Sequence, residues 1–280
     1  MTRIWVGSRR AASRPNYSRL AAATKTPKAD IRSRRTESRL GVDMQLRICE
    51  ETLNAPPAYG DRVDSLLTDL ERYGWCRFAT SLECEAEIAL AADRAAELLG
   101  RPTSGRAGAT QEAIVPRVRT EAHPRSQSAT HGLDALPLHV ELSHRSVPCR
   151  YVVLGCADPG HPGSATTTLE WRTLGFTADE IALLKGAPLL IRNGRRSFYS
   201  TALPRDGRFL RYDGECVEAV DARGHAALEA IRARLSSVTP TAHCLQRGEV
   251  LVIDNWRMLH GREVVAEHSG RRLTRRLVDA

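Results

Sequence analysis

The spacing of apolar residues predicts two helices at the start of the patterned part of the chain. Over residues 61–73 the apolar positions recur every three or four residues on one face, and Gly74 follows directly. Residues 83–99 are rich in Ala, Glu and Leu and are followed by Gly100, a residue typical of helix ends. We therefore predict a pair of helices ahead of the rest of the domain.

Strand patterns dominate the remainder of the chain. Short runs with strand character, bounded by Gly, Pro, Asp or Asn, occur at residues 75–78, 113–118, 136–142, 151–156, 166–170, 189–192, 208–212, 250–254 and 273–278. Two further helices interrupt them. One follows Thr177, which forms a capping-box pattern with Glu180, and the other spans about residues 225–235. Many short strands after two helices predict an α+β, mainly β fold, a double-sheet barrel with helices packed outside.

The positive charge of the chain is concentrated at its beginning. The formal net charge is +8, and residues 1–43 hold eleven Lys or Arg against three Asp or Glu, which accounts for the whole excess. From Met44 onward 30 basic residues balance 30 acidic ones. The body therefore lacks the basic footprint of a nucleic-acid-binding protein, and we expect no nucleic-acid partner.

Residues 1–43 are also rich in Ser and Ala and show neither helical nor strand period. This composition predicts a basic, disordered tail ahead of a single domain over residues 44–280. Three interpretations of the tail stay open. It is a solvated segment without specific function, sequence upstream of a start at Met44, or an arm for targeting or for an anionic partner.

Two negative features bear on the compartment. No stretch reaches the ~18 consecutive apolar residues of a membrane span, and the N-terminus has no apolar signal segment. The seven cysteines are scattered and never spaced C-x-x-C, which argues against a disulfide framework and a structural zinc site. We expect a cytoplasmic protein with no membrane partner, and the sequence leaves the oligomeric state open, a homo-oligomer included.

Two separate stretches carry candidate metal ligands. His139 and Glu141 lie two residues apart on the predicted strand 136–142, so their side chains are expected to face the same side. His260 comes much later and precedes Gly261, which allows the backbone to pass close to whatever His260 binds. Two imidazoles and one carboxylate are the facial triad that holds Fe(II) with open positions.

The last predicted strand carries four arginines. Arg272 and Arg276 share one face of this strand, and Arg271 and Arg275 share the other. An inward arginine suits a buried dicarboxylate, because its planar fork binds a carboxylate through two hydrogen bonds. Taken without the metal-ligand stretches, the same residues also fit a solvated edge strand.

In this order, the motifs resemble the taurine dioxygenase and clavaminate synthase superfamily of iron(II)/2-oxoglutarate oxygenases, from about Asp61 to the C-terminus. The resemblance implies a double-stranded β-helix (jelly roll) core with flanking helices. It also implies Fe(II) held by His139, Glu141 and His260, with 2-oxoglutarate and O2 as cosubstrates. The supporting motifs are Gly74-Trp75, Ala165-Thr166-Thr167-Thr168, Arg211-Tyr212-Asp213, Asp254-Asn255, His260-Gly261-Arg262 and Arg272-x-x-x-Arg276.

The resemblance also implies roles at the far end of the cosubstrate. Arg272 and Thr166 would bind the distal carboxylate of 2-oxoglutarate, and Arg276 would contact the substrate. This register is preferred because the family's Arg-x-x-x-Arg is followed by apolar residues, as Arg276 is here. The other register, with Arg271 and Arg275 inward, stays open.

The carboxylate ligand is Glu, as in clavaminate synthase and similar amino-acid hydroxylases, whereas most of the superfamily has Asp. This favours an amino-acid-like small molecule of secondary metabolism (natural product biosynthesis) as the substrate, with hydroxylation as the default outcome. Desaturation, epoxidation and cyclisation stay open, and so do a zinc hydrolase using His, Glu and His and a non-catalytic metal-binding module. The polar, Arg-rich residues 186–214 are a candidate lid.

Overall fold

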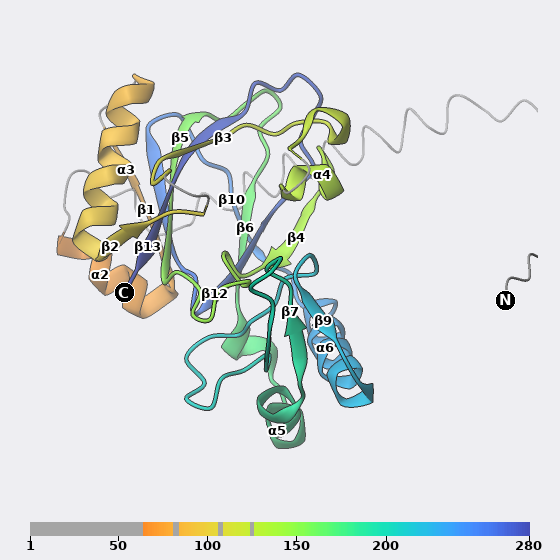
Figure 1. Ribbon diagram of the computed structural model, residues 1–280. Helices are drawn as coiled ribbons and strands as arrows, with labels where there is room; N and C mark the ends of the chain where they lie inside the picture. Colours follow the sequence, from red (N-terminus) through yellow and green to blue (C-terminus); the bar gives the residue numbers. More distant parts are fainter. Residues whose placement is uncertain (1–63, 81–83, 106–108, 124–125) are drawn as a thin grey trace, which may run out of the picture. The chain divides into compact units, whose positions relative to one another are not determined.

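The computed structural model describes residues 64–80, 84–105, 109–123 and 126–280, and it is a mixed α/β structure built mainly from sheets (Figure 1). The predicted boundary between a tail and a domain at residues 43 and 44 lies outside these residues. The helices are α2 (Asp64–Tyr73), α3 (Glu85–Leu99), α4 (Gln127–His131), α5 (Ala178–Gly186) and α6 (Ala222–Leu235), with 3-10 turns η2 (Arg119–Glu121) and η3 (Trp171–Leu174).

The largest sheet has the strand order β1-β11-β5-β13-β2, with β3 also paired to β13. Its strands are β1 (Trp75–Ala79), β2 (Arg101–Thr103), β3 (Glu112–Ile114), β5 (Tyr151–Asp158), β11 (Glu249–Asp254) and β13 (Arg272–Asp279). Helices α2 and α3 cover one face (Figure 1). The helix α3 lies so close that a Cβ on Gly155 of β5 would be 3.0 Å from Ile88 Cγ2. The same Cβ would lie 2.8 Å from Thr274 Cγ2 of β13, so any larger residue at position 155 would displace neighbouring side chains.

The second sheet has the order β10-β6-β12-β4. Its strands are β4 (Leu136–His139), β6 (Thr166–Glu170), β10 (Thr241–His243) and β12 (Met258–Arg262). A cavity between this sheet and the inner face of the largest sheet is lined by residues of both. Apolar side chains of β5, β11 and β13 form the core on that inner face, together with Met258 of β12. The two sheets therefore enclose an interior that is part core and part pocket.

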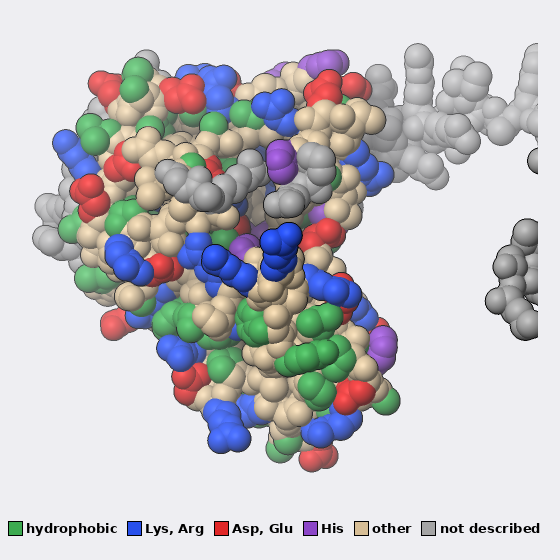
Figure 2. Space-filling view, in the orientation of Figure 1, with side chains coloured by type: hydrophobic (Ala, Val, Ile, Leu, Met, Phe, Trp, Pro, Cys, Tyr) green, Lys and Arg blue, Asp and Glu red, His purple; other side chains and the backbone are tan. Residues whose placement is uncertain are grey.

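A third sheet, with the order β8-β7-β9, packs with α5 and α6 (Figure 1). Its strands are β7 (Leu189–Ile191), β8 (Phe198–Ser200) and β9 (Val217–Ala219). Its core continues into the second sheet through Leu169 and Leu259. The predicted capping box is present, since Thr177 and Glu180 exchange side-chain and backbone hydrogen bonds at the start of α5. Figure 2 shows Lys and Arg side chains gathered across the middle of one face.

Two strand predictions fail in an informative way. Residues 208–212, predicted as a strand, are irregular, and the buried side chain of Arg211 donates there to loop carbonyl groups instead. The predicted strand 136–142 ends at His139. Leu142 has a φ of 58°, a left-handed conformation that strands do not contain. The strand therefore stops two residues before Glu141.

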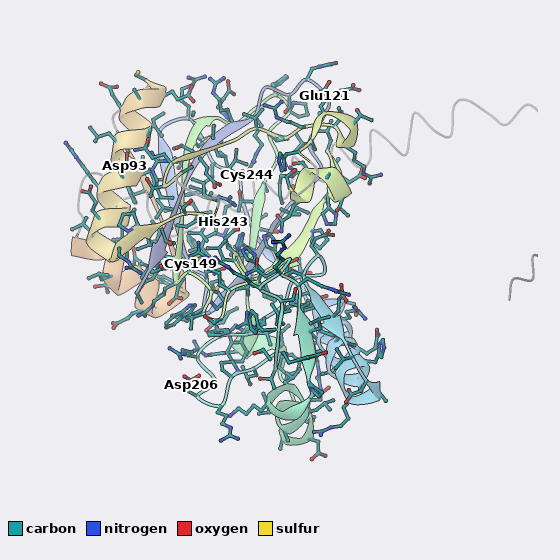
Figure 3. The ribbon with its side chains drawn as sticks, viewed as in Figure 1. Asp93, Glu121, Cys149, Asp206, His243 and Cys244 are labelled. Carbon is teal, nitrogen blue, oxygen red and sulfur yellow. The ribbon has the colours of Figure 1, made fainter. Side chains whose placement is uncertain are left out.

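Most of the described cysteines are buried, as is His243, and Cys149, His243 and Cys244 are labelled in Figure 3. Cys76, Cys84, Cys149, Cys156 and Cys216 are free thiols, whereas Cys244 is disulfide-bonded. His243 is buried and pairs with the hydroxyl of Thr168 at 2.8 Å. Burial and then Arg77 lower the pKa of His243 to about 3. None of the described helices is long and apolar enough to cross a membrane.

Candidate metal centre

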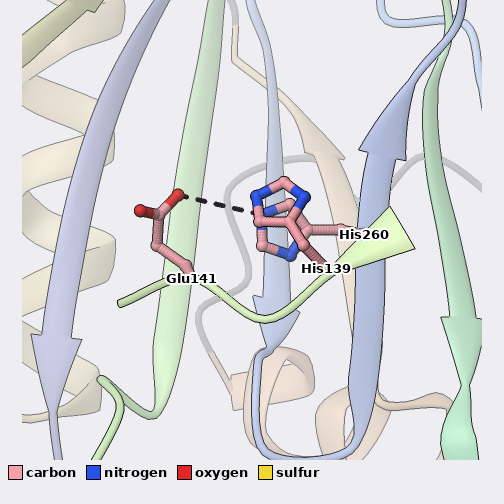
Figure 4. A group of neighbouring side chains, drawn as sticks. All are labelled: His139, Glu141 and His260. Carbon is pink, nitrogen blue, oxygen red and sulfur yellow. Dashed lines mark ion pairs between the residues drawn. The ribbon is translucent and has the colours of Figure 1, made fainter. Parts of the chain in front are cut away.

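Three predicted metal ligands meet at one end of the second sheet (Figure 4). His139 of β4 and His260 of β12 are direct cross-strand partners, with ring centroids 4.5 Å apart. Glu141 approaches from just beyond β4, and its Oε2 is 3.9 Å from Nε2 of His260. The potential ligand atoms of the three residues lie within 4.8 Å of one another. Strand pairing thus brings together ligands 121 residues apart in the sequence.

The position of Glu141 is fixed by a side chain from β11's end, not by strand alternation. The amide of Asn255 is fully buried and contacts both backbone groups of Glu141. Its Oδ1 accepts from Glu141 N at 2.8 Å, and its Nδ2 donates to Glu141 O at 3.0 Å and to Cys149 O at 2.8 Å. Asn255 was noticed in the sequence only as part of a motif. Strand alternation alone already predicted that Glu141 lies on the same side as His139, so there was no reason in the sequence to look for a second residue that positions Glu141. Only the structure shows this role of Asn255.

Gly261 lines the cavity beside His260, and it also has a structural role in the sheet. A Cβ at this position would lie 2.5 Å from the carbonyl oxygen of Leu136 and 3.1 Å from the hydroxyl of Thr167. Such a contact is not tolerated by real side chains. The glycine therefore permits the close pairing of β12 with its neighbours, which is what sets His260 beside His139.

A hydrogen bond orients the ring of His139, and burial favours the neutral form of His260. His139 Nδ1 lies 3.0 Å from the carbonyl oxygen of Pro137. A carbonyl only accepts hydrogen bonds, so Nδ1 carries the proton and Nε2 is left for a metal. Burial, and then the nearby His139, lower the pKa of His260 to about 4. His260 Nδ1 is buried without a hydrogen-bond partner among the described residues, and Nε2 is the ring nitrogen on the side of Glu141.

The carboxylate of Glu141 is held in its charged form. Burial acts to raise its pKa, but Arg275, His260 and His139 together keep the pKa well below its ordinary value. Arg275 Nη1 donates to Glu141 Oε2 at 2.6 Å, and Nη2 of the same guanidinium contacts Glu112. One anionic and two neutral ligands suit a divalent cation such as Fe(II), so the residues present fit the metal that the resemblance implies.

The cluster faces a cavity of about 530 Å³ between the two large sheets, a size typical of small-molecule sites. Val152, Leu154 and Leu273 supply apolar lining from one sheet. Thr166, Arg271 and two acids outside the second sheet, Asp213 and Glu215, supply polar lining. Asp213 belongs to the Arg211-Tyr212-Asp213 motif of the sequence analysis, whereas Glu215 carried no sequence signal. From the candidate lid 186–214, only Arg192 and Asp213 line this cavity.

The predicted inward orientation of Arg272 and Arg276 is wrong. Arg272 is partly exposed, and its Nε lies 3.0 Å from a carboxylate oxygen of Glu85 on α3. Arg276 is buried on the same face, with Nη2 3.2 Å from Asp93 Oδ2 on α3. Both therefore face the helix. The alternative register is the observed one, because Arg271 and Arg275 line the cavity.

Arg271 is buried in the cavity wall at 4% exposure, beside the predicted Thr166. Its Nη2 donates to Thr166 Oγ1 at 3.1 Å, and its Nε donates to Ser164 O at 3.2 Å. It has no carboxylate partner among the described residues. Burial, and then the nearby Arg262, lower its pKa to about 10, so it stays charged at neutral pH. Thr166 lies where it was predicted, but next to Arg271 instead of Arg272.

Comparisons with known proteins find a family model and solved structures of similar fold. A sequence model of the taurine catabolism dioxygenase TauD, TfdA family matches residues 182–277. An asparagine oxygenase complex with Fe(II), a hydroxyasparagine and succinate has a TM-score of 0.63 at 19% identity, covering 76% of this chain and 77% of that one. OrfP, a non-haem iron oxygenase in complex with iron and α-ketoglutaric acid, has a TM-score of 0.63 at 20% sequence identity. The match covers 78% of this chain and 79% of OrfP. PvcB from Pseudomonas aeruginosa has a TM-score of 0.58 at 18% sequence identity, and the match covers 79% of this chain and 81% of PvcB. No curated protein matches the sequence.

The fold and the His-Glu-His cluster define the class of non-haem iron oxygenases. The matches support the TauD/TfdA-like superfamily of iron/2-oxoglutarate dioxygenases, with the family model covering residues 182–277. The same findings support an oxidoreductase and agree with the predicted superfamily. The predicted iron and 2-oxoglutarate agree with the ligands of the similar structures.

Proposed function

We propose that the chain hydroxylates an amino-acid-like small molecule of secondary metabolism, using Fe(II), 2-oxoglutarate and O2. One observation carries the proposal. The His139, Glu141 and His260 cluster and the uncompensated guanidinium of Arg271 face the same cavity. The cavity therefore contains a potential metal-binding site and, separate from it, a potential binding site for a carboxylate.

Arg271 and Thr166 are proposed to hold the distal carboxylate of 2-oxoglutarate. Along β6, Thr168 is paired with His260, and Thr166 lies two residues further on. Two residues of an antiparallel strand span roughly 7 Å, a separation that suits a five-carbon dicarboxylate reaching from the metal to Arg271. A buried guanidinium binds such a group through its planar fork, and the Thr166 hydroxyl adds a third donor.

The remaining residues orient the metal ligands. Bound Fe(II) would supply O2 activation coupled to decarboxylation of 2-oxoglutarate, which drives oxidation of a C–H bond. His139, Glu141 and His260 would hold it from one side. Asn255 fixes the backbone of Glu141, and Arg275 fixes its carboxylate. Two independent contacts on one ligand limit the geometries that this ligand adopts.

Several observations support an amino-acid-like substrate. The similar structures include an asparagine oxygenase and OrfP bound to a hydroxyarginine. The ligand is Glu141, in agreement with the amino-acid hydroxylases that the sequence resembles. The same cavity carries both guanidinium and carboxylate groups, with Asp213 and Glu215 among its lining. This mixed charge suits a small zwitterion. A double-stranded β-helix formed by the two large sheets and a cytoplasmic location are part of the proposal.

The decisive experiment is anaerobic addition of Fe(II) and 2-oxoglutarate to the full chain. Chelation of the cosubstrate is expected to produce a weak visible absorption band, and candidate amino acids are then screened by the shift of this band. Succinate formation on admitting O2 completes the test. Zn(II) serves as the control, since it gives no such band. Hydrolytic activity with Zn(II), and no band with Fe(II), would favour the zinc hydrolase.

A further inference from the structure

A second cavity of about 600 Å³ is lined by the loop that follows Glu141. His144, in this loop, lines both cavities. Three arginines line the second cavity, and Asp279 is the one acidic side chain among its described lining residues. These arginines come from separate parts of the chain: Arg145, Arg196 and Arg208. Basic side chains thus converge on a space of small-molecule size beside the metal centre.

The three arginines are only partly neutralised. Arg196 is exposed and has no ion pair with any described residue. Arg208 uses Nε to contact Asp206 at 2.8 Å, and no described residue pairs with its terminal nitrogens. Asp206 lies on the loop labelled in Figure 3. Arg145 lies 3.8 Å from Asp279. At least Arg196 and Arg208 therefore retain donors for an anion.

A fourth guanidinium lies beneath the wall of this cavity. Arg211 is 1% exposed and donates to the carbonyl oxygens of Ser143, Arg145 and Ser146. It has no carboxylate partner in the described part of the chain. Its charge is therefore not cancelled locally, and it adds positive potential to the cavity. Its hydrogen bonds also hold the wall in one position.

Two aromatic rings give the cavity rigid sides. Trp256 Nε1 donates to Pro148 O at 3.0 Å, which fixes the ring against the same loop. The guanidinium of Arg208 lies 5.4 Å from the centroid of the Trp256 ring. Phe198 supplies the second ring. An arginine stacked on an anchored ring loses little freedom on binding an anion, so the site is preorganised.

We propose that the second cavity binds a phosphate-bearing group, and that this group is the remote end of the molecule oxidised at the metal centre. Arginine forks match phosphate oxygens in the way that they match carboxylates. The shared His144 gives the adjacency that one extended substrate needs. That the phosphate belongs to the oxidised molecule rests on the proposed function, whereas phosphate binding by itself does not.

Inorganic pyrophosphate is the probe, titrated into the metal-free full chain and followed by tryptophan fluorescence. We expect a saturable change that disappears in Trp256→Phe. Arg208→Gln and Arg196→Gln should each weaken binding about tenfold or more, since each removes a charged donor. Arg195→Gln is the matched control. Arg195 is exposed on the same hairpin and does not line the cavity, so binding should change less than about twofold.

Two results would overturn phosphate binding at this place. One is an equal loss in Arg195→Gln, which would indicate diffuse attraction to the basic hairpin. The other is a loss in Arg271→Gln with none in Arg208→Gln, which would put the anion in the 2-oxoglutarate seat. Because neither iron nor 2-oxoglutarate is present, this titration is independent of the proposed function.

A second measurement tests the link to the substrate. Phosphorylated amino acids and their unphosphorylated forms are added to the anaerobic complex with Fe(II) and 2-oxoglutarate. One extended substrate is supported if a phosphorylated amino acid shifts the visible band and pyrophosphate reverses this shift. The band itself must remain, because its loss would mean that pyrophosphate displaced 2-oxoglutarate. If pyrophosphate binds but does not compete with any phosphorylated amino acid, the phosphate site does not hold the remote end of the substrate. Failure of the band itself contradicts the proposed function and leaves the fluorescence result standing.

Discussion

The two faces of β13 present the same residue type to different surroundings. Arg275 on the inner face, together with Arg271 directly before the strand, lines the cavity, and the outer face carries Arg272 and Arg276 toward α3. On the outer face each arginine has one helix carboxylate. On the inner face Arg275 bridges two carboxylates, one of them the ligand Glu141, and Arg271 has none among the described residues.

This difference separates structural from ligand-binding arginines. A buried charge without a counter-charge is costly to the folded chain unless another group compensates it. Arg276 has that compensation within the protein, through Asp93 on α3. Arg271 has only the neutral oxygens of Ser164 and Thr166. The unpaired arginine is therefore the one expected to bind an external anion.

The largest effect is expected on removing the inner-face carboxylate. Glu141→Ala should abolish turnover and the visible band, because Fe(II) would keep two neutral imidazoles and lose its anionic protein ligand. Glu85→Ala on the outer face is the matched control and should leave both unchanged. Succinate production by Glu141→Ala at the wild-type rate would show that another residue supplies the carboxylate ligand.

Arg271→Gln should produce the next largest effect. Charged hydrogen bonds contribute roughly 1.5–3 kcal/mol each, and the distal carboxylate of 2-oxoglutarate would be left buried and unpaired. The apparent 2-oxoglutarate affinity is expected to fall tenfold to a thousandfold, at about 1.4 kcal/mol per tenfold. Titration of the visible band measures it. Arg271→Lys should recover part of the loss, since a point charge does not reproduce the fork. No recovery at all would question a role for charge.

Arg276→Met should affect stability and leave the cavity alone. The side chain is fully buried, while that of Asp93 is about a quarter exposed. Breaking a buried pair costs about 3–5 kcal/mol, and the partial exposure puts our expectation near 2–3 kcal/mol by denaturant unfolding. The double variant Arg276→Met, Asp93→Leu should regain much of it. The affinity of folded Arg276→Met for 2-oxoglutarate should change less than about threefold. A larger change would contradict the separation of the two faces.

Helices α2, α3, α5 and α6 and the long strands β5, β11 and β13 followed from the sequence because local signals set them, whereas α4 and strand β12, which carries His260, were not predicted. Strand β6 matches its predicted range 166–170, and the capping box of Thr177 and Glu180 starts α5 as predicted. The three ligands were also recognised, since a strand spacing and a distant His-Gly are visible without coordinates. Their grouping agrees with the prediction, although Asn255, and not strand alternation, fixes Glu141.

The arginine register did not follow from the sequence, for a physical reason. Apolar residues flank both registers: Leu273 and Leu277 share the inner face, and Val278 shares the outer one. The pairing of β13 with β5 also shifts between Arg272 and Leu273. The choice depends on which face meets the carboxylates of α3, a tertiary contact that the strand pattern does not contain.

Arg272→Gln should have the smallest effect, and it sharpens the comparison most directly. Arg272 and Glu85 are both substantially exposed, and such surface pairs contribute about 0–1 kcal/mol. Unfolding free energy should therefore fall by less than about 1 kcal/mol, and 2-oxoglutarate affinity should change less than about threefold, or 0.7 kcal/mol. Arg271 and Arg272 are adjacent and chemically identical, so their variants differ only in the face they probe. If Arg272→Gln lost the cosubstrate while Arg271→Gln kept it, β13 would be shifted by one residue in solution. Arg276 would then replace Arg275 beside Glu141, and the ion pairs with α3 would have to be broken.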